Sequence, residues 1–250
     1  MTLRSTYNDP KTTTRNAALL AKRSGTTVKS AMTFLKTVAS VQVNDRYHKP
    51  SAENYAPTGA PSGHYQSDVM FIEDYKGVNA KRMAILTVLN TTTRYAAARG
   101  LLNVKAASIT AGLVEIIDEL RKNGKTISVL RVDGGGEFKA GTKTMLQKRE
   151  IELEVGEPNT HYRLARTDRF HRTLRERLGG HFEREDTHKW VNVLPDIIQN
   201  MNESPHRTLS EVLKREATPN SITPIEEDII RSDELRRAST LGEKVDNLTS

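Results

Sequence analysis

The chain has 250 residues, a formal charge of +7 and an apolar share of 36%. This length accommodates one medium domain with extensions or two small domains. The apolar share lies below the roughly 45–50% of globular proteins, a figure that also counts Gly, so part of the chain is expected to be exposed. The lack of cysteine excludes disulfides and Cys-containing zinc sites. No apolar run approaches the roughly 20 residues of a membrane span. The positive charge favours a polyanionic partner such as nucleic acid, with simple solubility as the alternative.

The first sixty residues are predicted to be an extension. Residues 1–16 are polar and Thr-rich, which predicts disorder, and they lack the apolar stretch of a secretory signal. Residues 17–60 are expected to form a helical region followed by a linker, because apolar residues recur there at helical spacing before a segment rich in Pro, Gly, Ser and Asn. The helical region is either a small helix-turn-helix-like unit or an arm that packs on the main domain.

The main domain is expected at residues 61–209, where the pattern alternates between strands and helices. The predicted strands cover 65–74, 82–89, 94–101, 127–132 and 152–155, and the predicted helices 106–122, 142–149, 167–184 and 188–202. This order predicts an α/β fold with a mixed five-stranded sheet flanked by helices. Residues 210–250 are expected to be a polar tail, with a solvated helix near 226–237 and disorder from 238 to 250.

Three acidic residues come from three different predicted elements. Asp68 lies within an apolar strand, Asp133 ends another strand before a Gly-rich segment, and Asp168 opens a helix. Two divalent ions about 3.5–4 Å apart can activate a nucleophile and stabilise the leaving oxygen in phosphodiester chemistry. Mg²⁺ prefers oxygen ligands such as these carboxylates. Taken singly, Asp133 has an alternative interpretation as a turn residue and Asp168 as a helix-start acid. Asp68 is costly to bury unless it is paired or bound to metal.

An arginine-rich helix follows the third acid. Asp168, Arg172 and Arg175 have the spacing of one helix face, whereas Phe170, Leu174 and Leu178 are spaced to meet the core. The guanidinium groups suit a phosphate backbone. The alternative is internal ion pairing with Asp168 and Glu176. The positive stretch also contains Arg163, Arg166 and Arg169. We interpret His64, His161, His171 and His181 as structural or surface residues.

Several segments resemble the integrase catalytic core of retroviruses and retrotransposons, and most closely the integrases of large self-synthesising DNA transposons and virophage-like elements. The first is Tyr65-Gln66-Ser67-Asp68, and the second runs from Arg131 to Phe138 as Arg-Val-Asp-Gly-Gly-Gly-Glu-Phe. The third runs from Thr167 to Arg175, where the family typically has Glu-Arg-Phe-Asn-Arg-Thr-Leu-Lys. The resemblance covers roughly residues 60–222, including His206-Arg207-Thr208 and Thr218-Pro219.

The resemblance implies a ribonuclease-H-like fold and a DNA integrase, a polynucleotidyl transferase that processes and joins DNA ends with Mg²⁺ or Mn²⁺. Asp68, Asp133 and Asp168 would be its catalytic and metal-binding residues. Arg172 and Arg175, with Arg166 and Arg169, would contact DNA. It also implies a homo-oligomer, no membrane association and, for a eukaryotic source, a nuclear location.

Three departures from the family pattern leave a second hypothesis open. Asp168 stands where the family has Glu, and its side chain is one methylene shorter. The spacing between the second and third acids (168 − 133 = 35) is also one residue shorter than usual. The tail shows no small all-β module. The alternative function is therefore a catalytically impaired, domesticated integrase derivative that binds nucleic acid or serves in assembly.

Overall fold

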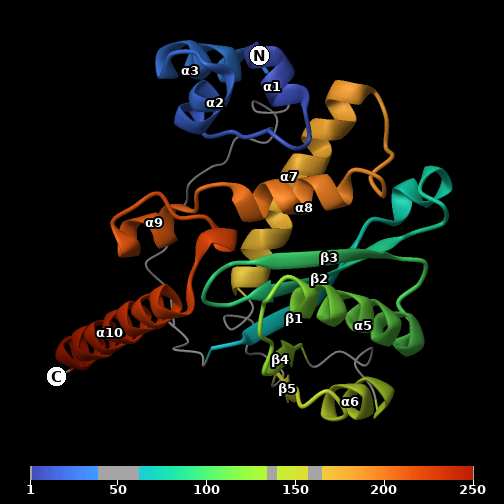
Figure 1. Ribbon diagram of the computed structural model, residues 1–250, viewed down its shortest axis with the longest axis vertical. Helices are drawn as coiled ribbons and strands as arrows, with labels where there is room; N and C mark the ends of the chain where they lie inside the picture. Colours follow the sequence, from blue (N-terminus) through green and yellow to red (C-terminus); the bar gives the residue numbers. More distant parts are fainter. Residues whose placement is uncertain (1, 39–61, 134–139, 157–164, 250) are drawn as a thin grey trace.

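The computed structural model describes residues 2–38, 62–133, 140–156 and 165–249. A mixed sheet lies at its centre, helices cover both faces, and a small helical unit caps one end (Figure 1). The strands are β1 (His64–Phe71), β2 (Ala84–Asn90), β3 (Ala96–Leu101), β4 (Val129–Val132) and β5 (Glu152–Val155). The helices are α1 (Leu3–Asn8), α2 (Ala17–Ser24), α3 (Val28–Thr37), α5 (Ala106–Lys122), α6 (Ala140–Gln147), α7 (Ala165–Glu185), α8 (Leu194–Glu203), α9 (Arg207–Leu213) and α10 (Pro224–Thr249), with short 3₁₀ turns at Glu73–Val78 and Pro219–Ser221.

The described strands form one five-stranded sheet in the order β3-β2-β1-β4-β5. β1 pairs antiparallel with β2, and β2 pairs antiparallel with β3. β1 pairs parallel with β4, and β4 pairs parallel with β5. Antiparallel neighbours can be joined by short turns, whereas parallel neighbours need a longer crossover, such as the one through α6 that joins β4 to β5. The predicted mixed sheet is confirmed, and each predicted strand of the main domain corresponds to an observed one.

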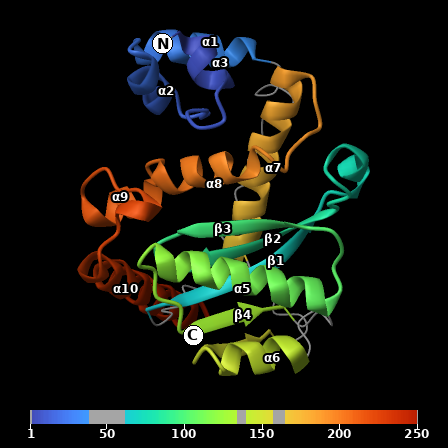
Figure 2. The same cartoon turned by 45° about the vertical axis from the view of Figure 1, so that its right-hand side comes forward.

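Helices cover both faces of the sheet, with α5 on one side and α7 on the other (Figure 2). Strand β2 is buried along its whole length because it lies inside the sheet between the two helical layers. Its side chains alternate: Leu86 and Val88 join the α5-side core, whereas Ile85 and Leu89 join the α7-side core. Phe170, Leu174 and Leu178 of α7 enter that second core, as their spacing predicts, and α8 adds Leu194, Ile197 and Ile198.

The N-terminal helices form a small unit with its own apolar core of Tyr7, Leu20, Ala21, Ala31 and Leu35. The prediction of disorder for residues 1–16 is wrong at α1, since Thr2 and Ser5 close a capping box and Tyr7 packs edge-on against Phe34. The polar composition of this segment gives no sign of a helix. The helix is stabilised by the buried ring of Tyr7 and by its N-terminal capping box. The two predicted helices are present as α2 and α3.

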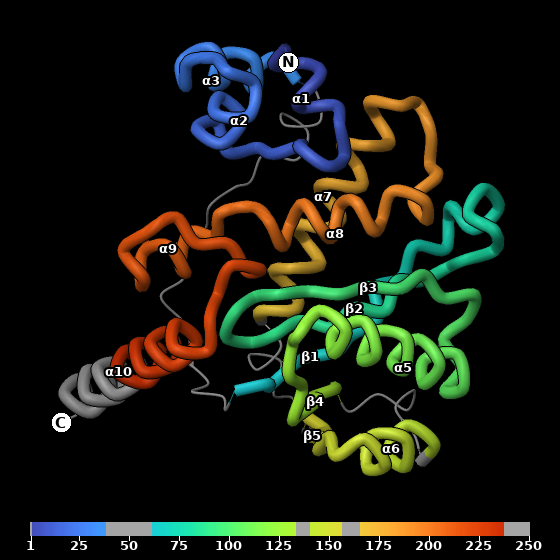
Figure 3. The backbone as a smooth tube through the Cα atoms, viewed as in Figure 1, coloured from blue at the N-terminus to red at the C-terminus, as the bar shows by residue number. Residues whose placement is uncertain are grey.

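The N-terminal unit also packs on the main domain. The long helix α7 runs from the sheet to the unit (Figure 3). Arg177 of α7 donates to the carbonyl of Thr13, and Arg184 lies over the ring of Tyr7. From α8, the buried Asn200 amide donates to two carbonyls of the N-terminal segment. These contacts are largely polar, in contrast with the apolar core inside the unit.

The C-terminal region differs from the predicted polar tail. Helix α9 crosses the expected boundary at residue 209, and Leu209, Ala217 and Ile230 form a small buried cluster that ties α9 to α10. Helix α10 continues to Thr249, where disorder was predicted from 238. Within the described residues, no helix has the length and apolar character to cross a membrane.

The polar joint at Asn200 gives a test of this packing. Its amide nitrogen donates to the Pro10 and Thr13 carbonyls at 3.0 and 2.9 Å, and its oxygen accepts from Arg23 at 3.1 Å. We expect Asn200→Ala to lower the free energy of unfolding by about 1–3 kcal/mol, because buried polar groups lose their partners. Urea denaturation measures the change, with the exposed neighbour variant Gln199→Ala as control. Equal stability of the two variants would contradict this role.

Candidate active site

Asp68 lies in the middle of β1 on the face that α7 covers. Its neighbours at two-residue spacing, Gln66 and Met70, point the same way: Gln66 accepts a hydrogen bond from Thr167 of α7 at 3.0 Å, and Met70 belongs to the α7-side core. The Asp68 side chain is 24% exposed. One of its carboxylate oxygens accepts from the main-chain N–H of Val69 at 2.7 Å. The carboxylate is therefore held in place at a partly open position.

Asp133 directly follows β4, at the carboxyl end of the strand, as predicted. In the parallel pairing of β1 with β4, Gln66 lies opposite Arg131 and Ser67 lies opposite Val132. The next position along each strand is Asp68 on one and Asp133 on the other. Neighbouring strands are about 4.8 Å apart, so the same register brings the two acids together on one face of the sheet.

Helix α7 supplies a further contact to Asp68 through His171, which is buried at 4% exposure. Its Nδ1 lies 3.5 Å from a carboxylate oxygen of Asp68, and its Nε2 lies 2.7 Å from the hydroxyl of Thr87 on β2. The same hydroxyl lies 3.0 Å from the main-chain oxygen of Asp68. The sequence interpretation of His171 as a structural or surface residue missed this contact. Its four-residue spacing from Thr167, which anchors the first turn of α7 on β1, is the signal that could have found it.

The His171 imidazole is neutral near pH 7, because burial, and then the positive charge of Arg175, lower its pKa from 6.5 to about 4. Its contact with Asp68 is therefore not an ion pair. A neutral ring has one N–H. With the hydrogen on Nε2, the ring donates to Thr87, Thr87 donates to the Asp68 carbonyl, and the Nδ1 lone pair faces the carboxylate. With the hydrogen on Nδ1, the ring presents an N–H to the carboxylate. Only the tautomer with the hydrogen on Nδ1 attracts the Asp68 carboxylate, whereas the other tautomer is held by Thr87 alone.

Asp168, Arg172 and Arg175 are all exposed along α7, consistent with the predicted shared face. Across the described residues, no ion pair joins either arginine to Asp168 or to Glu176, which instead pairs with Arg15 at 3.8 Å. The α7 side chain that contacts Asp68 is His171, whereas Asp168 points outward. In the part of the chain that the structure describes, no group of three or more His, Asp or Glu side chains is placed to hold a metal ion.

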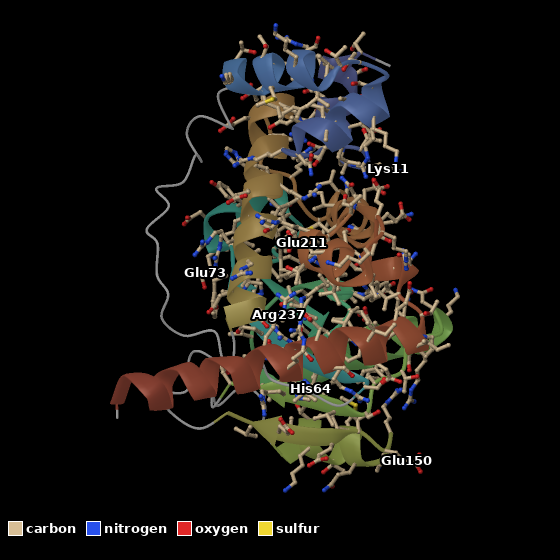
Figure 4. All side chains as sticks on the ribbon, turned by 90° about the vertical axis from the view of Figure 1, so that its left-hand side faces the viewer. Lys11, His64, Glu73, Glu150, Glu211 and Arg237 are labelled. Carbon is tan, nitrogen blue, oxygen red and sulfur yellow. The ribbon has the colours of Figure 1, made fainter. Side chains whose placement is uncertain are left out.

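The remaining predicted residues that the structure describes differ in burial. Arg166 is 14% exposed, donates to the carbonyl of Thr91, and pairs with the buried Glu234 of α10 at 3.0 Å. Arg169 is exposed. His64 begins β1: it is 3% exposed and lies 3.3 Å from Glu154, at the sheet beneath α10 in Figure 4. Arg163 and His161 lie outside the described residues.

Comparisons with known proteins address the fold. No protein-family model matches the chain, and no curated protein matches it. A chain of the simian T-cell lymphotropic virus intasome, solved in complex with PP2A regulatory subunit B56 gamma, is 15% identical with a TM-score of 0.56, and the match covers 86% of this chain and 76% of that chain. The catalytic core domain of BIV integrase is 18% identical with a TM-score of 0.47, covering 71% and 99%.

The structural neighbours are thus retroviral integrase structures at low identity. The intasome match and the sheet order β3-β2-β1-β4-β5 show that the chain has the ribonuclease-H-like fold of integrase cores, as the sequence predicts. At 15% identity the likeness extends to the fold alone, and the candidate site stands on its own geometry.

The lowered pKa of His171 makes the stability pH-dependent. The unfolded chain binds a proton at this residue below about pH 6.5, whereas the folded protein binds it only near pH 4. This contribution is therefore complete above pH 6.5 and is lost as the pH falls toward 4. We expect the drop in urea midpoint between pH 7 and pH 5 to be smaller in His171→Asn than in the unaltered protein. His64 and His206, also buried with lowered pKa values, contribute equally to both proteins. Identical drops in the two proteins would contradict the assignment.

Proposed function

We propose that this chain is an integrase-type polynucleotidyl transferase that cuts and joins DNA ends. The observation that carries the proposal is the parallel register of β1 and β4, in which Ser67 lies opposite Val132, because the next residue along each chain is Asp68 within β1 and Asp133 directly after β4. The fold supports it, because integrase structures share this sheet. The motifs around Asp68, Asp133 and Asp168 further favour the integrases of large self-synthesising DNA transposons within the wider family.

The donor set fits Mg²⁺ or Mn²⁺, which prefer carboxylate oxygens and commonly take one or two carboxylates together with waters. In the proposal Asp68 and Asp133 would hold the metal, and Asp168 on the first turn of α7 would be the third acid of the set. Bound divalent ions would lower the pKa of the attacking water or hydroxyl and stabilise the leaving oxygen. His171 and Thr87 keep the Asp68 carboxylate and its main chain in a fixed orientation. Such preorganisation matters, because displacements near 1 Å can cost about 10²-fold in rate.

The DNA-binding surface of the proposal is the exposed face of α7 that carries Arg172 and Arg175. Both guanidinium groups lie on the same face as Asp168, so a phosphate backbone bound to them would pass next to the acids. The net charge of +7 favours association with DNA at low salt. We further propose that the protein acts as a homo-oligomer, since the intasome neighbour is an assembly, and that a eukaryotic version acts in the nucleus.

One specific observation favours the alternative function, a nucleic-acid-binding integrase derivative with impaired catalysis. The side chain of α7 that contacts Asp68 is His171, whereas Asp168 is exposed and is one methylene shorter than Glu. The carboxylate of an aspartate at this position reaches roughly 1.5 Å less far than that of a glutamate. A displacement near 1 Å can already cost about 10²-fold in rate, so the shorter side chain favours impaired catalysis.

The first test compares strand transfer by the unaltered protein and by Asp68→Asn in the presence of Mn²⁺. We expect the substitution to reduce the rate by roughly 10²-fold or more, because the amide removes a charged ligand and displaces the reacting groups. Asp168→Glu separates the two functions: a gain approaching roughly 10²-fold would show an impaired native site. Equal strand-transfer rates for the unaltered protein and Asp68→Asn would contradict the catalytic proposal.

The second test addresses the DNA face. Each of Arg172→Ala and Arg175→Ala should weaken duplex binding uniformly across sequences and reduce the slope of log K against log salt by about 1. Lys122→Ala is the matched control, because this exposed cation lies on α5, which covers the opposite face of the sheet. Fluorescence anisotropy at several salt concentrations measures the slopes. If Lys122→Ala reduces the slope as much as Arg172→Ala does, DNA does not bind preferentially to the α7 face.

A further inference from the structure

The arginines of α7 do not all share one face of the helix. Successive residues of an α-helix are rotated by about 100°, because one turn takes 3.6 residues. Arg172 and Arg175 therefore lie near Asp168, Arg166 and Arg177 lie roughly half a turn away, and Arg169 lies between these positions. A DNA strand that follows the Asp168 face does not reach Arg166 or Arg177 without bending around the helix. These two residues and Arg169 form a second group of arginines.

The second group lines a cavity of about 300 Å³ between α7 and the segment that joins α8 to α9. Arg94, at the turn before β3, adds a fourth guanidinium group to the lining. The same cavity has apolar walls, which include Phe170 and Pro205. A cationic cavity with an apolar wall combines the two properties that a ligand with a charged end and a flat apolar part requires.

Four positively charged side chains line this cavity. Arg94 and Arg166 share the carboxylate of Glu234, at 2.8 and 3.0 Å, and all three side chains are at most 14% exposed. Arg177 donates to the Thr13 carbonyl and lies near the negative charge of Glu176. Arg169 forms no ion pair with any of the described residues and is exposed at the cavity. Arg169 is therefore the guanidinium group of the cavity that is most accessible to an anionic ligand.

His206 lies in the same positively charged environment. Burial, and then the charges of Arg94 and Arg169, lower its pKa to about 4, so the ring is neutral near pH 7. Its Nδ1 is buried and has no hydrogen-bond partner among the described residues. A buried polar atom without a partner is uncommon and costs free energy. An anionic ligand in the cavity would accept from the guanidinium groups and place polar atoms near this nitrogen.

We propose that this cavity binds a phosphate-bearing ligand of nucleotide size, at a site separate from the DNA face of α7. Arginine favours phosphate because its planar group donates two parallel hydrogen bonds. The apolar wall at Phe170 and Pro205 suits a base, and the volume lies at the lower end of small-molecule pockets. The ligand is either a free nucleotide or one nucleotide unit of a DNA strand. This proposal goes beyond strand transfer and does not depend on it.

The test measures binding of deoxyadenosine monophosphate, deoxyadenosine and a 5′-phosphorylated single-stranded tetranucleotide by calorimetry. Arg169→Ala is the test variant, because this exposed residue can be removed without breaking a buried ion pair. Lys122→Ala is the control, because this exposed cation lies on α5, on the other side of the sheet. We expect the monophosphate to bind and the nucleoside to bind at least roughly tenfold more weakly. Arg169→Ala should weaken the monophosphate by roughly tenfold or more, and Lys122→Ala should leave it unchanged.

The tetranucleotide distinguishes the two sources. If the tetranucleotide binds more tightly than the monophosphate and its binding depends on Arg169 in the same way, the cavity is assigned to a DNA strand. If it binds equally or more weakly, the cavity is assigned to a free nucleotide. The proposal is overturned if neither phosphate-bearing probe binds, if the nucleoside binds as tightly as the monophosphate, or if Lys122→Ala weakens binding as much as Arg169→Ala does. Strand-transfer activity does not enter any of these outcomes, so failure here leaves the catalytic proposal standing.

Discussion

The packing of α7 against β1 and β2 is the interaction on which the candidate site depends. Phe170, Leu174 and Leu178 bury one side of the helix in the sheet. That burial sets the rotation of the whole helix about its axis, because the directions of the side chains of a helix are fixed relative to one another. It brings His171 to Asp68 and turns Asp168, Arg172 and Arg175 outward. The buried bond between Thr167 and Gln66 then fixes how far the helix slides along β1.

The same rotation separates two sets of positive charge that look continuous in the sequence. Arg166, Arg169, Arg172 and Arg175 follow one another within ten residues. In the structure, two of them lie beside Asp168, whereas the other two line a cavity with Arg94 and His206. A helix so rich in arginine would repel itself if all its charges shared one face. Distribution over two faces lowers that repulsion, and Glu234 of α10 offsets part of the remainder.

Much of the fold was predictable, because strand and helix periodicities in residues 65–202 follow directly from which face is buried. Asp68 and Asp133 were predictable as a pair, since each lies within or directly after an apolar strand, where a carboxylate is costly to bury unless it is paired or bound to metal. The contact of His171 with Asp68 was not predictable. Sequence spacing shows which residues of α7 share a face, but it does not show which of these faces is turned toward Asp68. Helix α1 was missed since one aromatic residue and a cap stabilise it. The ion pair between Arg166 and Glu234 joins residues far apart in the chain, where no local pattern applies.

The central claim is that Asp68 and Asp133 together form a divalent metal site next to α7. A crystal structure of the protein with saturating Mn²⁺ tests it most directly, since Mn²⁺ is identified by its anomalous scattering. The account predicts a Mn²⁺ ion in contact with both carboxylates, and it predicts that the ion disappears in Asp133→Asn. A structure with Mn²⁺ at other acids and none between Asp68 and Asp133 would contradict the account.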